Sequence, residues 1–115
     1  MTTTDRAAKI AALNDALRKS PTDRRLGKTT MTDGVDALGP EKVAALIAQV
    51  TSFDAFSEDN DPYGEHDFGS VTLDGEKYFW KIDYYAKADP NMGSEDPSDE
   101  MVTERVLTLM RTDEY

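Results

Sequence analysis

Cysteine is absent from the 115 residues of this chain, and histidine and tryptophan each occur only once. The lack of cysteine excludes disulfide bonds, a nucleophilic thiolate, and zinc or iron–sulfur sites built on cysteine. It also fits a reducing compartment, and since the sequence opens without an apolar signal core, we expect a cytoplasmic protein. No hydrophobic run approaches the length of a membrane span, so we expect no membrane partner.

Basic residues are also scarce: 13 lysines and arginines stand against 23 aspartates and glutamates, which gives a net charge of −10. Binding to a nucleic-acid backbone depends on clustered lysine and arginine, so we predict no direct nucleic-acid binding. An acidic surface suits a protein partner with a basic surface, including proteins that themselves bind DNA. A simpler interpretation is a charge that only keeps an ordinary protein soluble.

Apolar residues at helical spacing predict three helices. The first covers residues 5–19, the second begins at Pro40, and the last starts near 96 or 99 and runs to about 112. The buried line of the last helix would consist of Val102, Val106 and Leu109.

A β-hairpin is predicted around Asp74-Gly75, a dipeptide that favours a two-residue turn. When the strands are paired outward from this turn, His66 lies opposite Asp83. One face of the hairpin collects apolar side chains that should pack on the helices, and the other face is too polar for a core. Residues 28–32, which are rich in threonine, could add a short edge strand.

These elements predict an α+β fold. We expect a single domain over residues 1–115, with a small antiparallel sheet centred on the hairpin at about 66–85. Two or three helices would pack on one face of this sheet and leave the other face open.

The segment at 60–69 reads Asn-Asp-Pro-Tyr-Gly-Glu-His-Asp-Phe-Gly and contains the single histidine, three carboxylates and two glycines. His66, oriented by Asp83 and assisted by Glu65, could act as a general acid or base near neutral pH. The same oxygens and imidazole could hold a hard metal ion. Alternatively the cluster is structural, and the asparagine and first aspartate form the hydrogen bonds that hold the turn.

The structural use is favoured because no known metal-binding spacing is matched, and we predict no metal and no cofactor. The same region could instead bind a protein partner, since exposed aromatic side chains are frequent hot spots of interfaces. The residues expected to contact that partner are Asp61, Tyr63, Asp67, Phe68, Lys81 and Tyr85.

Five short segments carry a resemblance to a known family. They read Leu-Asn-Asp-Ala-Leu-Arg at 13–18, Phe-Asp-Ala-Phe at 53–56, the sequence quoted above at 60–69, Phe-Trp-Lys-Ile-Asp-Tyr-Tyr at 79–85, and Arg-Val-Leu-Thr-Leu-Met at 105–110. Together they resemble the bacterial family catalogued only as domain of unknown function 3768. The resemblance implies a small bacterial protein, often associated with plasmids or other mobile DNA, and it implies no activity.

The leading functional hypothesis is a non-enzymatic, acidic protein-binding module. It would act through residues 60–68, the polar face of the hairpin and the acidic loop at 89–99. With the resemblance, the negative charge suggests an accessory or anti-defence factor of mobile elements that mimics the charge of DNA. The alternative is a small hydrolase-type enzyme with a His/Asp/Glu site around His66. The oligomeric state does not follow from the sequence.

Overall fold

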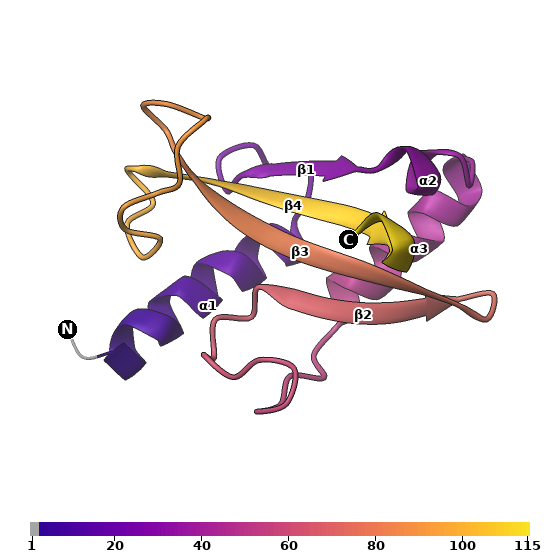
Figure 1. Ribbon diagram of the computed structural model, residues 1–115, viewed down its shortest axis with the longest axis horizontal. Coiled ribbons are helices and arrows are strands. Elements are labelled where there is room, and N and C mark those ends of the chain that lie inside the picture. The colour runs from indigo at the N-terminus through magenta and orange to yellow at the C-terminus, as the bar shows by residue number, and fades with distance from the viewer. Residues whose placement is uncertain (1–2) are drawn as a thin grey trace.

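The computed structural model describes residues 3–115, which form one four-stranded sheet with helices on one side (Figure 1). The elements are α1 (Thr3–Lys19), β1 (Lys28–Met31), α2 (Asp33–Asp36), α3 (Pro40–Ser52), β2 (Phe68–Leu73), β3 (Glu76–Ala86), β4 (Thr103–Arg111) and the 3₁₀ helix η1 (Thr112–Glu114). The strand order is β1-β4-β3-β2. The predicted α+β class is confirmed, but the sheet is mixed rather than wholly antiparallel because β1 runs parallel to β4.

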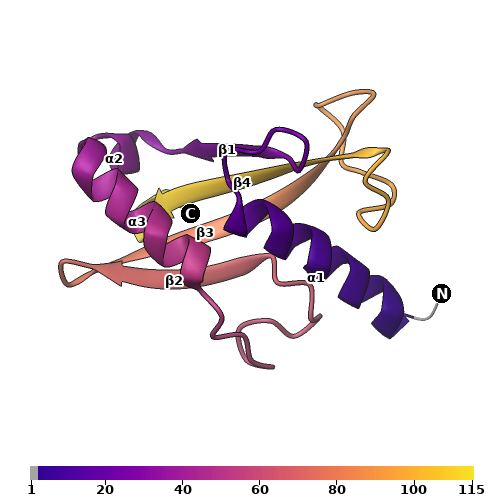
Figure 2. The ribbon, with the colours of Figure 1, turned by 180° about the vertical axis from the view of Figure 1, so that it is seen from behind.

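Helices α1 and α3 cover the same face of the sheet (Figure 2). The core lies between them and the two central strands, where apolar side chains are removed from water. Its buried members include Leu17, Leu46, Val50, Trp80, Ile82, Leu107 and Leu109. The opposite face, called the open face below, carries no helix except the short η1 (Figure 1) among the described residues. No helix within residues 3–115 is both long and apolar enough to cross a bilayer.

The predicted hairpin is confirmed. Asp74 and Gly75 have φ angles of 53° and 80°, the left-handed pair that a type I′ turn requires. The register sets Gly69 opposite Trp80. A Cβ atom on Gly69 would lie 2.6 Å from the indole Nε1, so the indole packs on a position that only glycine can fill.

The predicted last helix is wrong, because residues 103–111 form strand β4 between β1 and β3. The side chains that point into the core at every second position are Thr103, Arg105, Leu107 and Leu109. A threonine and an arginine in this series hide the period of two that marks a strand. The valines and leucine used for the helix prediction fall at helical spacing by coincidence.

Candidate functional site

His66 does not pair with Asp83. The backbone at His66 has a φ of 56°, which breaks the strand alternation and turns the imidazole towards the helices. Its Nδ1 lies 3.0 Å from Oδ1 of Asp15 on α1, and its ring stacks on Phe56 with centroids 3.9 Å apart. Asp83 belongs to the open face, where it pairs with Lys81 at 3.0 Å. The predicted His66–Asp83 pair is therefore wrong, since the two side chains lie on opposite sides of the sheet.

Asp61 is buried and binds the backbone that follows it. Its Oδ1 accepts hydrogen bonds from the N–H groups of Glu65 at 3.1 Å and His66 at 3.2 Å. Its Oδ2 lies 3.7 Å from Nε2 of the imidazole. These are the turn-fixing bonds of the structural interpretation, and they leave this carboxylate enclosed rather than at the surface.

Arg18 extends from α1 into the core and is only 1% exposed. One terminal nitrogen donates to the carbonyls of Val50 and Phe53 at 3.0 and 2.7 Å, and the other donates to Asp15 at 3.0 Å. The guanidinium also lies 5.3 Å from the centroid of the Trp80 ring. The last carbonyls of a helix have no partner within it, and that end favours a cation. Arg18 thus caps α3 while it anchors α1.

A second group of buried polar side chains joins α1 to β3 and β4. Asn14 donates to the Glu65 carbonyl at 2.9 Å and to the Tyr84 hydroxyl at 2.8 Å, and it accepts from Nε of Arg105 at 2.8 Å. The Tyr84 hydroxyl donates to the Glu65 carboxylate at 3.0 Å, and Arg105 donates to the carbonyl of Pro97. Burial raises the pKa of Tyr84 and lowers the pKa of Arg105.

Together these side chains form what we call the polar junction. Its members are Asn14, Asp15, Arg18, Asp61, Glu65, His66, Tyr84 and Arg105.

The polar junction contains the residue types used for acid–base chemistry, but they are bonded to one another. The imidazole of His66 has a carboxylate near each ring nitrogen, and the Glu65 carboxylate is bound by Tyr84. Beside them, burial and the charge of Glu65 raise the pKa of Asp67. Within residues 3–115, no three histidine or carboxylate side chains are grouped so that they could hold a metal ion. The arrangement can orient an imidazole, and its hydrogen bonds fix residues 53–67 to α1.

The structure separates the remaining residues predicted to bind a partner. Tyr63 is 80% exposed, far more than its half-buried neighbour Asp67. Phe68, Lys81 and Tyr85 are partly exposed on the open face. These residues and the buried Asp61 therefore do not form one continuous surface.

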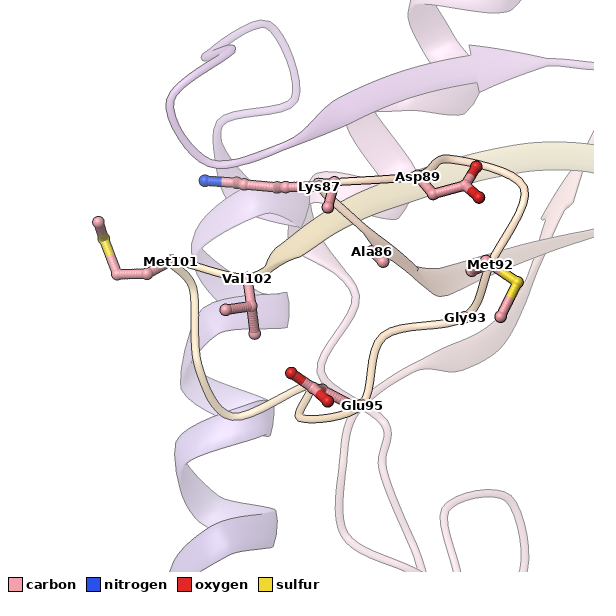
Figure 3. A pocket seen from close by; sticks show the side chains of 9 residues that line it. Ala86, Lys87, Asp89, Met92, Gly93, Glu95, Met101 and Val102 are labelled. Carbon is pink, nitrogen blue, oxygen red and sulfur yellow. The ribbon is translucent and has the colours of Figure 1, made fainter.

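A surface hollow of about 600 Å³ lies where residues 86–102 leave β3 and return to β4. Met92 and Met101, which are 60% and 77% exposed, lie on opposite sides of it (Figure 3). The charged residues Lys87, Asp89 and Glu95 also line it. The hollow so defined is called the loop hollow.

Two backbone hydrogen bonds tie the chain on either side of the loop hollow to the end of β3. The N–H of Ala86 donates to the Met92 carbonyl at 2.9 Å, and the N–H of Lys87 donates to the Val102 carbonyl at 3.0 Å. The composition of this segment predicted an acidic loop, and the methionines were not used in that prediction. Two methionines in a loop rich in proline, glycine and acidic residues are the signal that could have located the hollow.

Fold and site together define a small α+β protein with an internally bonded polar junction and an exposed acidic loop. The family described as "Protein of unknown function (DUF3768)" matches residues 31–114. The chain belongs to this family, which confirms the resemblance of its sequence segments. No curated protein and no solved structure gives a significant match.

Proposed function

We propose that this protein is a non-enzymatic, acidic protein-binding module whose loop hollow receives a basic, partly apolar segment of its partner. The observation that carries the proposal is the pairing of two exposed methionines with carboxylates around one hollow of about 600 Å³. Methionine is flexible and polarizable, so it adapts to apolar side chains of different shapes. Exposed methionines are therefore suited to contact a partner.

The charge of the loop favours a basic partner. Residues 87–102 contain five acidic residues and one lysine. Asp96 is engaged within the protein, where bonds from Ser98 and Arg6 lower the pKa of its carboxyl group. Asp89 and Glu95 are exposed at the hollow. Such a patch attracts a basic surface over several ångströms and fixes its orientation on docking.

This proposal fits an accessory or anti-defence role connected with mobile DNA. A protein that binds DNA presents a basic surface, and an acidic module could occupy that surface in place of DNA. The bonding within the polar junction favours a structural role for it in this module. Its histidine and carboxylates are hydrogen-bonded within the protein rather than directed at a substrate.

The proposal is tested with a short helical peptide of leucine and lysine as a model of the basic segment. The chain has five methionines, so methyl NMR can observe the hollow directly. We expect the peptide to shift the methyl signals of Met92 and Met101 and to leave those of Met31 and the buried Met110 in place. Raised salt should weaken the binding, because exposed charges are screened.

A pair of double variants separates the hollow from net charge alone. Asp89→Asn with Glu95→Gln should weaken peptide binding about fivefold or more. The control is Glu58→Gln with Asp59→Asn, which removes two exposed charges from another loop. Equal weakening by both double variants, or an equal shift at Met31, would show that the peptide senses only overall charge and would refute the proposal.

A further inference from the structure

Strand β1 forms one margin of the sheet and pairs only with β4 among the described elements (Figures 1 and 2). In a parallel pair, alternate residues direct both backbone groups at the neighbouring strand. The N–H of Thr32 donates to the Leu109 carbonyl at 3.1 Å. Lys28 and Thr30 lie four and two residues earlier, so their backbone groups also point towards β4. The backbone N–H and C=O groups of Thr29 and Met31 consequently point away from the sheet.

A second surface hollow, of about 510 Å³, lies along this margin. Met31 and Ile47 supply apolar lining, and residues 21–24 close one side. The Thr29 hydroxyl donates to the Pro21 carbonyl at 2.8 Å, which ties that loop to β1. A strand added here would find unpaired backbone groups and, on its helix side, a place for an apolar side chain.

The margin carries positive charge although the chain as a whole has a net charge of −10. Arg24 and Lys28 both line the hollow. Arg24 pairs with Glu104 at 3.1 Å yet remains 66% exposed. Lys28 is exposed, and no ion pair of its own is found with residues 5–115. A second copy of this chain would bring the same cations to the same margin, whereas an acidic segment complements them.

We propose that the outer edge of β1 binds an extended peptide segment with alternating apolar and acidic residues, which adds to the sheet as a fifth strand. Its backbone pairs with Thr29 and Met31, its apolar side chains enter the hollow beside Ile47, and its carboxylates meet Lys28. This surface is separate from the loop hollow and binds an acidic segment, whereas the loop hollow binds a basic one. Either of the two proposals can therefore be refuted without the other.

The test uses an acetylated and amidated octapeptide of alternating valine and glutamate, with a valine–lysine octapeptide as its counterpart. Addition of the acidic peptide should slow hydrogen exchange of the Thr29 and Met31 amides about tenfold or more, because these donors become bonded. The basic peptide should leave both exchange rates unchanged. Met31→Pro, which removes an outward N–H that an edge strand can spare, should abolish binding, while Met31→Leu should retain it.

A charge reversal keeps the test valid even where the proline variant is unstable. Lys28→Glu should weaken binding of the acidic peptide about fivefold or more, and Lys77→Glu on β3 should change it by less than about twofold. Unchanged exchange at Thr29 and Met31, or equal weakening by the two reversals, would overturn the proposal. Dimerisation of the protein that Met31→Pro abolishes would overturn it as well, because a second copy would then be the occupant.

Discussion

The polar junction and the loop hollow both contain carboxylates, but the protein uses them differently in the two regions. In the junction, Asp15 and Asp61 accept hydrogen bonds from His66 and from the chain's own backbone. At the hollow, Asp89 and Glu95 are exposed beside methionines that are also exposed. A concentration of histidine and acidic residues in a sequence therefore does not by itself identify a functional surface, because the protein can use such groups to hold its own fold together.

The largest expected effect breaks the junction at Arg18. Arg18→Met keeps an unbranched, apolar stem of similar length but removes the charged donor from the carbonyls of Val50 and Phe53. The Val50 carbonyl then keeps only the backbone N–H of Phe53, at 3.2 Å. We expect the free energy of unfolding to fall by about 3 kcal/mol, because buried acceptors lose a charged partner. Urea denaturation measures this change.

Arg25→Met is the matched control for Arg18→Met. Arg25 is exposed and pairs with Asp23 two residues away, so its loss should leave the free energy of unfolding nearly unchanged. Equal effects of the two substitutions would mean that Arg18 does not hold α1 to α3, and the junction would lose its structural role.

A smaller loss is expected when the imidazole is removed. His66→Ala gives up the bond to Asp15 and the stacked contact with Phe56, which together should cost about 1.5 kcal/mol of folding free energy. Tyr63→Ala, three residues away and exposed, should cost less than about 0.5 kcal/mol. If His66→Ala left stability unchanged, residues 53–67 would be held by other contacts and His66 would be released for a role in binding or chemistry.

Local signals were sufficient to predict much of the fold. Asp74-Gly75 and the flanking alternation predicted the hairpin register, Gly39-Pro40 predicted the start of α3, and the threonine-rich run predicted β1. The element that was predicted wrongly is β4. An arginine is typical of a surface position, but Arg105 of this strand is buried. Its burial depends on Asn14, a residue 91 positions away, and a local pattern cannot contain that information.

The candidate site was predicted less well than the fold, and one residue explains most of the difference. Extending the hairpin register placed His66 beside Asp83, on the assumption that the strand continues. A residue other than glycine seldom adopts a positive φ, so the turn of the backbone at His66 was not foreseeable. Its partner Asp15 lies 51 positions earlier in a helix, where nothing in the local sequence marks it as a neighbour.

A pH-dependent effect is expected at Asp67, where burial and then the charge of Glu65 raise the pKa of the carboxyl group. The folded state therefore holds this proton more tightly than the unfolded chain, and the associated stability is lost as the pH rises through the folded-state pKa. Near neutral pH the carboxylate is charged, which is unfavourable in its partly buried position. Asp67→Asn removes this charge and should stabilise the protein by about 0.5 kcal/mol near neutral pH. The gain should disappear in acid below the unfolded-state pKa.

Urea denaturation across this pH range, with Asp59→Asn as the control, measures the effect of Asp67→Asn. Asp59 is exposed, so its substitution should show less of this pH-dependent gain. A gain at Asp67 that persisted unchanged into acid would indicate that the amide acts through a new hydrogen bond rather than through the removed charge.

The smallest expected effect on stability is also the one that most sharply distinguishes the two regions. Met92→Ser combined with Met101→Ser should change the free energy of unfolding by less than about 0.5 kcal/mol, because both side chains are largely exposed. The same substitution at the buried Met110 should cost about 3 kcal/mol. The double variant should nevertheless lose binding of the leucine–lysine peptide. If it instead lost stability as Met110→Ser does, the two methionines would act as a small core that closes the loop, and the hollow would have no apolar surface left for a partner.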